Sequence, residues 1–433
     1  MKQGKKVTVL GAGKSGIAAA NLLHQNGMQV FLSEKGKQHF EIDPVIKSEF
    51  CGHSEKIYDC DFAVISPGIP INLPLVQKFT CPVYSEIEIA SWFIDFPMIG
   101  ITGSNGKTTT TAILAEMLKS SGFHAIACGN IGKPLSEIAQ KTPHPNSVAV
   151  VELSSFQLET IDKFHPAVAA VLNLSPDHLD RYDSFDDYCK TKIKIAKNLD
   201  VAEPFVVNGD DPVLLKHSEN FTNRVFFSLS GNQEFRYEDG VFFLRGKPLI
   251  ETKNLQISGL HNYANILAAM TIVHAFGADV KTCLNGLRNF GGIPHRLEKI
   301  SIPSEIQVYN DSKATNSDSV SWALRSFDQP IILLMGGIAK EKTYSHLQNL
   351  VNDKVKRIIA FGQDREKIAT EFGYKIPTQI TETLHKAIEL AVFHAENSDI
   401  ILLSPGCASF DEFSNFEERG DFFKQKIREI FHA

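Results

Sequence analysis

The stretch Met98–Thr111 constrains the fold of this chain more than any other. Its sequence, MIGITGSNGKTTTT, starts as an apolar strand, passes through two glycines and ends in a run suited to the start of a helix. Gly103 and Gly106 allow a tight turn with inward N–H groups, while the helix terminus and Lys107 add positive charge. A strand, a glycine turn and a helix in this order predict a nucleotide phosphate site in an α/β domain.

This phosphate loop departs from the usual P-loop pattern. G-x-x-x-x-G-K-[ST] needs glycine at position 101, which is Ile101, so the chain carries the shorter Thr102-Gly-Ser-Asn-Gly-Lys-Thr108. Thr108 follows the lysine and offers a hydroxyl to Mg²⁺. The plain alternative is a solvated strand-to-helix loop with an incidental lysine. We favour the phosphate site because both flanking elements are in place.

Length and composition restrict the class of protein. A chain of 433 residues exceeds one ordinary core and predicts two or three domains. Its 43% hydrophobic and 22% charged content is typical of soluble globular proteins. No apolar run reaches the roughly 18 to 20 residues that cross a bilayer, and the N-terminus lacks the apolar core of a signal peptide. We expect a cytoplasmic protein without membrane insertion.

Charge and cysteine usage exclude further classes. The net charge is −6 and there is no long basic stretch, which argues against nucleic acid as the main partner. The seven cysteines are scattered without a C-x-x-C pair. This spacing favours reduced thiols over a zinc site or a disulfide framework.

Residues 1–92 are predicted to form a Rossmann-like domain. Residues 5–10 and 28–32 have the pattern of buried strands, and Ser15–Asn26 between them has that of a helix. The next strand, Phe62–Ile69, runs into a Gly/Pro turn at the same carboxyl edge, where open α/β sheets bind ligands.

The first turn of this domain allows two interpretations. Gly11–Gly16 matches G-x-G-x-x-G, and Glu34 follows the second strand where a dinucleotide-binding protein places its ribose acid. Alone, this pattern would favour an NAD-binding oxidoreductase. The same geometry serves any nucleotide diphosphate, and a second phosphate loop near residue 103 does not suit a dehydrogenase. The oxidoreductase is kept as an alternative.

Residues 93–291 are predicted to form a central P-loop ATPase-like domain. Apolar strands alternating with helices imply a largely parallel sheet, which a hairpin and a buried helix follow. The expected strands lie near 123–128, 147–151, 168–172 and 204–207, the hairpin within 235–250 and the helix at 261–277.

Two places in the central domain offer metal ligands. Glu152 ends a buried strand, from which a carboxylate can reach the Mg²⁺ of a phosphate loop. An ordinary surface acid is the alternative, made less attractive by Ser154 and Gln157 just after it. The loop Asn173–Arg181 carries His178 between aspartates, and a neutral imidazole near a bound metal is a good ligand.

Lys192 stands out among the lysines of its segment. If Asp186–Leu199 is helical, Lys192 falls on the apolar face with Tyr188 and Ile195. The other lysines share a wet face: Lys190, Lys194 and Lys197. Either Lys192 has a buried role, or its stem snorkels to water. The pattern leaves both open.

Residues 292–433 are predicted to form a second Rossmann-like domain after the linker Gly291–Pro294. Three apolar strands each run into glycine, and helical patterns separate them, as in a doubly wound sheet. The strands are expected at Ile331–Met335, Arg357–Phe361 and Ile400–Leu403, and the helices at 364–372 and 381–396.

Taken together, these segments closely resemble the Mur ligase family, ATP-dependent amide-forming enzymes of peptidoglycan precursor synthesis. The resemblance spans the whole chain. Thr102–Thr109 resembles the family's phosphate loop, and Val151–Gln157 and Asn173–Arg181 resemble its magnesium and substrate loops. His295-Arg296 is similar to the entry to its third domain.

Two C-terminal stretches resemble the D-glutamate-adding branch of the family. They are Asp311–Asn316, with the sequence DSKATN, and Leu403–Gly420. The resemblance implies that ATP phosphorylates the carboxylate of UDP-N-acetylmuramoyl-L-alanine and that D-glutamate then displaces phosphate. ATP and two Mg²⁺ ions are the implied cofactors, and we expect a monomer. One departure is Ile338, where relatives often have an acidic residue, while Lys340 still matches.

The resemblance also implies roles for individual residues. The implied catalytic residues are Lys107, His178 and Lys192, and the implied metal ligands are Thr108, Glu152, His178 and a carbamylated Lys192. ATP would bind Gly103, Ser104, Asn105, Gly106, Lys107, Thr108, Thr109, Asn262, Arg296 and Asp311. The UDP substrate would bind Gly13, Ser15, Ser33, Glu34, Gly68, Asn130, Ser154 and Gln157. D-Glutamate would bind Lys313, Thr315, Lys340, Ser409 and Phe416, the last through its backbone.

Two further alternatives have other functions. A folylpolyglutamate synthetase also adds glutamate with a related fold, but it lacks a Rossmann-like domain of this kind before the phosphate loop. A regulatory ATP-binding protein would need no matched amino-acid pocket in the third domain.

Overall fold

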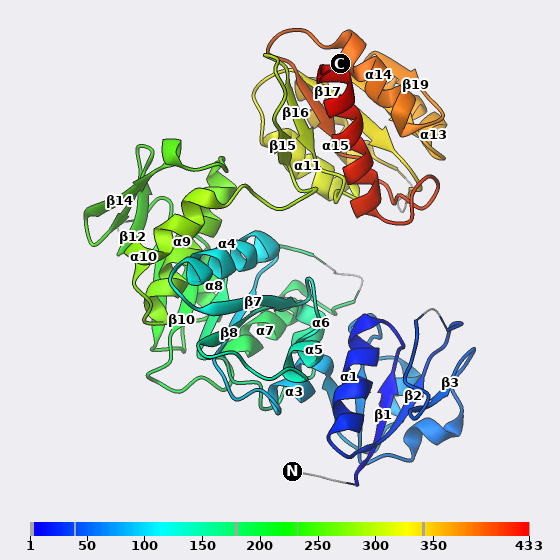
Figure 1. Cartoon of the computed structure of the whole chain (residues 1–433), viewed down its shortest axis with the longest axis vertical. Coiled ribbons are helices and arrows are strands. Elements are labelled where there is room, and N and C mark those ends of the chain that lie inside the picture. The colour runs from blue at the N-terminus through cyan, green and yellow to red at the C-terminus, as the bar shows by residue number, and fades with distance from the viewer. Residues whose placement is uncertain (1–3, 39, 178–180, 232, 340–342, 433) are drawn as a thin grey trace. The chain divides into compact units, whose positions relative to one another are not determined.

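The computed structural model describes every residue except 1–3, 39, 178–180, 232, 340–342 and 433. The chain divides into two compact units, Met1–Phe290 and Gly291–Ala433, and each is described by itself. Three sheets carry the fold, two in the first unit and one in the second (Figure 1). The expected three-sheet α/β fold is confirmed.

The N-terminal sheet is fully parallel, with strand order β3-β2-β1-β4-β5. Helix α1 (Lys14–Gln25) connects its first two strands, and Gly27 after it has φ +79°, as expected of a helix C-terminus. The strands are β1 (Lys6–Leu10), β2 (Gln29–Ser33), β3 (Lys47–Glu49), β4 (Phe62–Ile65) and β5 (Val83–Ser85), and the helices are η1 (Glu55–Tyr58), α2 (Pro74–Gln77) and α3 (Glu86–Ser91).

The strand expected at Phe62–Ile69 is shorter than predicted. β4 ends at Ile65, and the Ile69 amide donates to the Ser66 carbonyl at 2.9 Å in a turn. Pro67 has no N–H to continue the ladder, which is why the apolar run outlasts the strand.

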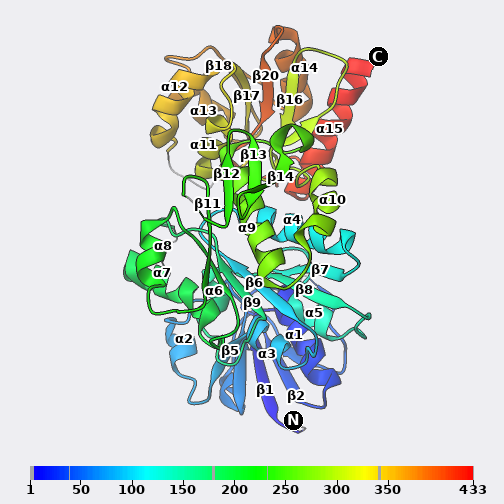
Figure 2. The ribbon, with the colours of Figure 1, turned by 90° about the vertical axis from the view of Figure 1, so that its left-hand side faces the viewer.

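The central sheet has nine strands in the order β14-β13-β12-β11-β10-β9-β6-β8-β7 (Figure 2). It is parallel from β7 to β12, and an antiparallel β12–β13–β14 meander extends it. The expected hairpin turn has φ +45° at Asp239 and +80° at Gly240, typical of a type I′ turn. The strands are β6 (Met98–Thr102), β7 (His124–Gly129), β8 (Ser147–Glu152), β9 (Val168–Val171), β10 (Phe205–Asn208), β11 (Arg224–Ser228), β12 (Phe235–Glu238), β13 (Val241–Leu244) and β14 (Lys247–Glu251).

Helix α4 (Lys107–Ser120) leaves the phosphate loop and packs against α9 (Leu260–Ala275) and α10 (Val280–Asn289). The helix expected over Asp186–Leu199 is shorter: α7 (Phe185–Ile193) passes into a 3₁₀ turn, η2 (Lys194–Ala196). The other helices of this part are α5 (Leu135–Ala139), α6 (Ser155–Leu158), α8 (Pro212–His217) and η3 (Thr252–Asn254).

The second unit holds a six-stranded sheet with order β15-β16-β20-β17-β18-β19. Only the β15–β16 pair is antiparallel among the pairs described. The strands are β15 (Glu298–Ile300), β16 (Gln307–Asn310), β17 (Ile331–Gly336), β18 (Val355–Phe361), β19 (Thr378–Ile380) and β20 (Ile400–Leu403), and the helices are α11 (Ser317–Arg325), η4 (Ser345–Leu347), α12 (Gln348–Lys354), α13 (Arg365–Phe372), α14 (Leu384–His394) and α15 (Phe416–His432).

Within the described part of the chain, no helix combines the length and apolar character needed to cross a membrane.

Candidate functional site

The phosphate loop joins β6 to α4, and its glycines are required by geometry. Gly106 has φ +82°, and a Cβ there would lie 2.3 Å from the Asn265 side-chain oxygen. Gly103 has φ +154° and packs against Leu172. Only glycine fits at position 106, so the predicted tight turn is confirmed.

Two lysines from different helices converge on this loop. The Lys107 Nζ donates to the Gly103 carbonyl at 2.8 Å and to the Ser104 carbonyl at 2.9 Å. The Lys192 Nζ, from α7, donates to the same Gly103 carbonyl at 2.9 Å. Two amines that share one acceptor repel each other when both are charged, which favours a neutral form of the more buried one.

Lys192 is the more buried lysine, with 2% of its surface exposed. Its Nζ also lies 4.8 Å from the centre of the Tyr188 ring. Burial, and then the charge of Lys107, lowers the pKa of Lys192 well below its usual value. The pattern left burial and snorkelling both open; the structure shows Lys192 buried on the apolar face, and the snorkelling alternative is wrong.

Glu152 ends β8, the strand beside β6, and is 1% exposed. Its Oε1 accepts a hydrogen bond of 2.8 Å from the Asn130 side chain. Its Oε2 is buried and has no hydrogen-bond donor among the described residues. A buried carboxylate oxygen without a donor suits a divalent cation, so these residues fit Mg²⁺. Thr108, half-buried in the first turn of α4, is the nearest loop hydroxyl in sequence to Lys107.

The predicted ligand His178 lies outside the described residues. The loop before it is tied to the phosphate loop by Asn173. The Asn105 amide donates to the Asn173 side-chain oxygen at 2.8 Å, and the Asn173 side chain donates back to the Asn105 carbonyl at 3.1 Å. The segment leading to His178 is therefore held beside the phosphate loop.

Ser104 makes a second link between the same loops. Its hydroxyl donates to the Ser175 carbonyl and accepts from the Ser175 amide, both at 2.9 Å, and it lies 3.0 Å from the Tyr188 hydroxyl. The Ser104 hydroxyl and the Asn105 amide are thus engaged within the protein. Sequence reasoning did not select Asn173 or Tyr188 as site residues, although Asn173 is the second residue after β9.

Asn262 and its neighbour Asn265 lie on successive turns of α9. The Asn262 side chain donates to the Ser258 carbonyl at 2.8 Å, near the helix start. The Asn265 oxygen accepts from the Thr110 hydroxyl of α4 at 3.3 Å. Asn265, which sequence reasoning did not select, is the residue in contact with the helix of the phosphate loop. Thr109, on the same turn of α4, is buried.

The N-terminal glycine turn is closed by Glu34. Its carboxylate accepts from the Ala12 amide and from the Gly36 amide, both at 2.7 Å. A Cβ at Gly16 would lie 1.8 Å from the Gly11 carbonyl, so close packing requires this glycine. Glu34 therefore shapes the turn of which Ala12 is part.

The remaining candidates of this edge differ in their surroundings. Gly13 and Gly68 are exposed, and a Cβ at either would meet no atom within 4 Å. Ser33 is buried and its hydroxyl lies 2.7 Å from both Glu49 Oε1 and the His53 Nδ1. Ser15 is half-buried in the first turn of α1.

Ser154 and Gln157 form a capping box at the start of α6. The Gln157 amide donates to the Ser154 hydroxyl at 3.3 Å, and the Ser154 amide donates to the Gln157 side-chain oxygen at 3.0 Å. The box fixes the helix start three residues after β8 ends at Glu152.

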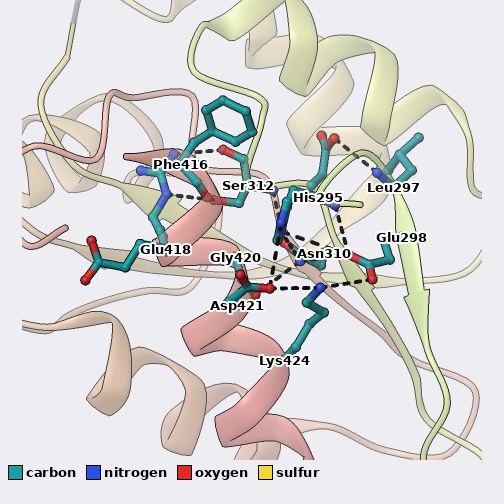
Figure 3. Close-up of polar contacts among 12 residues, drawn as sticks. His295, Leu297, Glu298, Asn310, Ser312, Phe416, Glu418, Gly420, Asp421 and Lys424 are labelled. Carbon is teal, nitrogen blue, oxygen red and sulfur yellow. Dashed lines mark hydrogen bonds and ion pairs between the residues drawn. The ribbon is translucent and has the colours of Figure 1, made fainter. Parts of the chain in front are cut away.

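In the second unit, His295 lies at the centre of a polar cluster (Figure 3). Its Nδ1 is 3.0 Å from the Asn310 side-chain nitrogen, which also donates to Glu298 Oε2 and to the Gly420 carbonyl, each at 3.2 Å. Burial, and then the charge of Lys424, lowers the pKa of His295. The cluster fastens the chain entering this unit to α15.

Asp311 and Arg296 are adjacent to this cluster. Asp311 is buried, and its carboxylate accepts from the Ser404 hydroxyl at 2.9 Å and from the Leu297 amide at 3.2 Å. Burial raises the pKa of Asp311 to about 7, against the opposing charge of Arg296. Arg296 itself is half-buried.

The candidates for D-glutamate surround the start of α15. The Lys313 Nζ lies 5.9 Å from the centre of the Phe416 ring, and the Ser312 hydroxyl donates to the Phe416 carbonyl at 2.8 Å (Figure 3). Thr315 is half-buried and Ser409 is buried. Lys340 lies outside the described residues.

Arg419, on α15, was not selected from the sequence. It is fully buried, and its guanidinium donates to the Ser312 hydroxyl at 3.0 Å, the Ser312 carbonyl at 2.9 Å and the Cys407 carbonyl at 3.1 Å. Burial lowers the pKa of Arg419 to about 10. Arg419 binds the segment after β16 to the segment after β20, the two stretches that carry the candidate residues.

Comparison with known proteins agrees with this arrangement. Three family models match the chain: MurD N-terminal domain at residues 6–72, Mur ligase middle domain at 101–273, and Mur ligase, glutamate ligase domain at 295–407. A UDP-N-acetylmuramoylalanine--D-glutamate ligase of Chlorobium chlorochromatii is 39% identical over 466 residues, covering 99% of each chain. Relatives with the same name from Elusimicrobium minutum (39% identical, covering 99% of this chain and 98% of theirs) and Christiangramia forsetii (38%, covering 99% and 100%) are equally similar.

Solved structures with lower identity share the fold. The MurF ligase of Thermotoga maritima in complex with ADP has a TM-score of 0.62 at 17% identity, covering 99% of this chain and 96% of its own. The UDP-N-acetylmuramate-alanine ligase MurC of the same organism has a TM-score of 0.62 at 18% identity, covering 98% and 100%. With family models along its length and full-length relatives at close to 40% identity, the chain belongs to the Mur ligase family, in the branch of the UDP-N-acetylmuramoylalanine--D-glutamate ligases.

Proposed function

We propose that this protein joins D-glutamate to UDP-N-acetylmuramoyl-L-alanine with consumption of ATP, a step of peptidoglycan precursor synthesis. The observation that carries the proposal is the convergence of Lys107 and Lys192 on the phosphate loop, with the buried carboxylate of Glu152 on the neighbouring strand, whose Oε2 has no hydrogen-bond donor among the described residues. The full-length similarity to relatives of this name supports the choice of substrates.

The proposed reaction has two steps. A carboxylate oxygen of the alanyl group attacks the γ-phosphorus of ATP, the bond from that phosphorus to the β,γ-bridging oxygen breaks, and ADP leaves. The amine of D-glutamate then attacks the carbonyl carbon of the acyl phosphate, inorganic phosphate leaves, and the ammonium formed loses a proton. One amide bond forms for each ATP converted to ADP and phosphate.

Lys107 contributes positioned charge in this scheme. Its amine is held between the Gly103 and Ser104 carbonyls at the start of α4, where the phosphates of a bound nucleotide are expected. Phosphoryl transfer moves negative charge among oxygens, so a fixed cation stabilises the transition state.

We assign the two proposed Mg²⁺ ions to the residues that fit them. Thr108 and Glu152 would hold one ion, and His178 and a carbamylated Lys192 the other. When bound, Mg²⁺ neutralises phosphate charge. The lowered pKa of Lys192 leaves part of its amine neutral, the form that adds CO₂.

The other candidates divide by substrate. Asn262, Arg296 and Asp311, with the loop residues Gly103–Thr109, would bind ATP. Gly13, Ser15, Ser33, Glu34 and Gly68 would bind the uridine diphosphate end, and Asn130, Ser154 and Gln157 the muramoyl part. Lys313, Thr315, Lys340, Ser409 and Phe416 would bracket D-glutamate. A cytoplasmic monomer remains our expectation.

Phosphate release across a substrate panel tests this proposal. Release should require ATP, Mg²⁺, UDP-N-acetylmuramoyl-L-alanine and D-glutamate together, and omission of any one should abolish it. Equal turnover with L-glutamate or with a folate acceptor would contradict the assignment. A change in NADH fluorescence on titration would revive the oxidoreductase alternative.

A further inference from the structure

Arg181 lies where three segments of the first unit meet. Its side chain is 12% exposed, and it is the last residue of the loop that begins at Asn173. The guanidinium donates to the Pro67 carbonyl at 2.8 Å and to the Ile69 carbonyl at 3.3 Å. These two carbonyls flank Gly68, so one planar guanidinium donates hydrogen bonds to both sides of the turn after β4.

The same guanidinium is fixed from its other side. It donates to Glu159 Oε2 at 2.9 Å, and the other oxygen of Glu159 accepts from the Tyr182 hydroxyl at 2.9 Å. Its central carbon lies 3.8 Å from the centre of the Phe156 ring, a stacked cation–π contact. Phe156 is in α6, between the capping residues Ser154 and Gln157.

The turn held by Arg181 also touches the N-terminal glycine turn. The Ser66 hydroxyl donates to the Gly11 carbonyl at 3.3 Å, and a Cβ at Gly11 would lie 2.5 Å from that hydroxyl. The 66–69 turn therefore has two contacts: Ser66 within it bonds to the Gly11 carbonyl of the N-terminal glycine turn, and Arg181, which follows β9 of the central sheet, bonds to the Pro67 and Ile69 carbonyls.

We infer that Arg181 is a positioning residue that holds the 66–69 turn against α6 and Glu159, so that the two ends of one extended UDP-sugar substrate meet a prearranged turn and a prearranged helix start. The inference rests on the proposed function for its substrate. It needs nothing from the second unit. A lysine cannot replace this arginine, because a single ammonium cannot donate to two carbonyls and a carboxylate while stacking on a ring.

The chain offers a matched control in Arg236. This arginine also stacks on a phenylalanine, 4.7 Å from the Phe243 ring centre, and pairs with Glu238 at 3.3 Å. It lies on the β12–β13 hairpin, and none of its contacts described involves a candidate substrate residue. Arg236→Ala therefore removes the same kind of interactions without releasing the 66–69 turn.

The test compares Arg181→Ala, Arg181→Lys and Arg236→Ala with the unaltered protein by hydrogen exchange and by kinetics. In both Arg181 variants the Ile69 amide should exchange about tenfold faster without any ligand, since its turn loses two anchors. The KM for UDP-N-acetylmuramoyl-L-alanine should rise about tenfold, while those for ATP and D-glutamate change less than about twofold. Arg236→Ala should change neither quantity.

The outcomes separate this inference from the proposed function. Unchanged exchange at Ile69, or an equal rise of all three KM values, would overturn the positioning role. Arg181→Lys provides the result if Arg181→Ala fails to fold. If the unaltered protein makes no amide product, the proposed function fails. The role of Arg181 is then decided by the exchange rate of the Ile69 amide and by a titration with UDP alone. Faster exchange together with UDP binding weakened about tenfold in the Arg181 variants supports the positioning role, and any other pair of results overturns it.

Discussion

Lys107 and Lys192 approach the Gly103 carbonyl from two helices, yet their environments differ. Lys107 is half-buried at the start of α4, whereas Lys192 is buried within α7. Burial lowers the pKa of Lys192 and so favours its neutral form. The two lysines therefore suit different tasks at one loop.

Lys107→Ala should reduce turnover on the order of 10²-fold or more, because it removes a fixed cation from the expected phosphate position. The glycine turn stays intact, so the melting temperature should change little. Lys119→Ala, at the far end of the same helix in a surface pair with Glu116, is the control and should keep full turnover. Near-normal turnover of Lys107→Ala would remove this lysine from the mechanism.

Lys192 is expected to be carbamylated in the active protein. The neutral amine adds CO₂ to form an N-carboxylate and releases one proton, which replaces a buried amine by an oxygen ligand for metal. Lys192→Ala should fold, lose most activity and regain part of it with acetate. Lys190→Ala, on the wet face of α7, should stay active.

Lys192→Arg should be inactive, because guanidinium stays charged and cannot form the carbamate. A fully active Lys192→Arg, or an unmodified amine in both the mass and the high-resolution density of the protein in bicarbonate buffer, would refute the modification.

The environment of a residue was predictable where the spacing of its sequence neighbours indicates a helix face or a turn. Helical spacing placed Lys192 on the apolar face but did not decide between burial and snorkelling, and the strand-turn-helix sequence indicated the need for glycine at 106. Arg181 and Arg419 could not be found this way, because their partners are carbonyls on segments far away in sequence. Residue spacing does not predict which backbone carbonyls tertiary packing brings within hydrogen-bond distance of an arginine.

At the scale of elements, Glu86 links helix α3 of the N-terminal domain to helix α5 of the central domain. It is buried, and its carboxylate accepts from the Ser136 amide of α5 at 2.5 Å. Burial raises the pKa of Glu86 to about 7, from a usual value of 4.5. The folded state therefore holds a proton that the unfolded chain releases between these values.

The stabilising contribution of this proton is complete below pH 4.5 and is lost as pH rises through 7. Between pH 5.5 and 8 the free energy of unfolding of the first unit should fall by about 2 kcal/mol from this group. Urea midpoints measured at both pH values check this, with Glu86→Gln as the comparison. The urea midpoint of Glu86→Gln should fall less between the two pH values than that of the unaltered protein. An equal fall of the midpoint in both proteins would contradict the assignment.

Strands and helices were predictable where an apolar run stands between glycine turns. β6, β8, β17 and β20 are such runs, and they form where expected. β15 and β19 are three residues long and carry few apolar side chains, so no periodicity marks them. β4 and α7 ended early for reasons of local chemistry, a proline in one case and a change to 3₁₀ geometry in the other.

At the scale of the whole molecule, the sequence predicted the α/β class and three sheets, because each sheet contains an apolar strand that runs into a glycine turn: β1, β6 and β17. The division at Phe290 and Gly291 falls at the Gly-Gly-Ile-Pro linker. Candidate nucleotide residues occur in both units, Lys107 in the first and Asp311 in the second. The proposed reaction accordingly needs the complete chain.

Transfer of ¹⁸O tests the central claim, ATP-driven ligation through an activated carboxylate, most directly. UDP-N-acetylmuramoyl-L-alanine labelled at both carboxylate oxygens is incubated with ATP, Mg²⁺ and D-glutamate, and the products are weighed by mass spectrometry. Each phosphate released should carry one ¹⁸O, and the amide product should retain the other. Unlabelled phosphate, or phosphate released without a D-glutamyl product, would contradict the account.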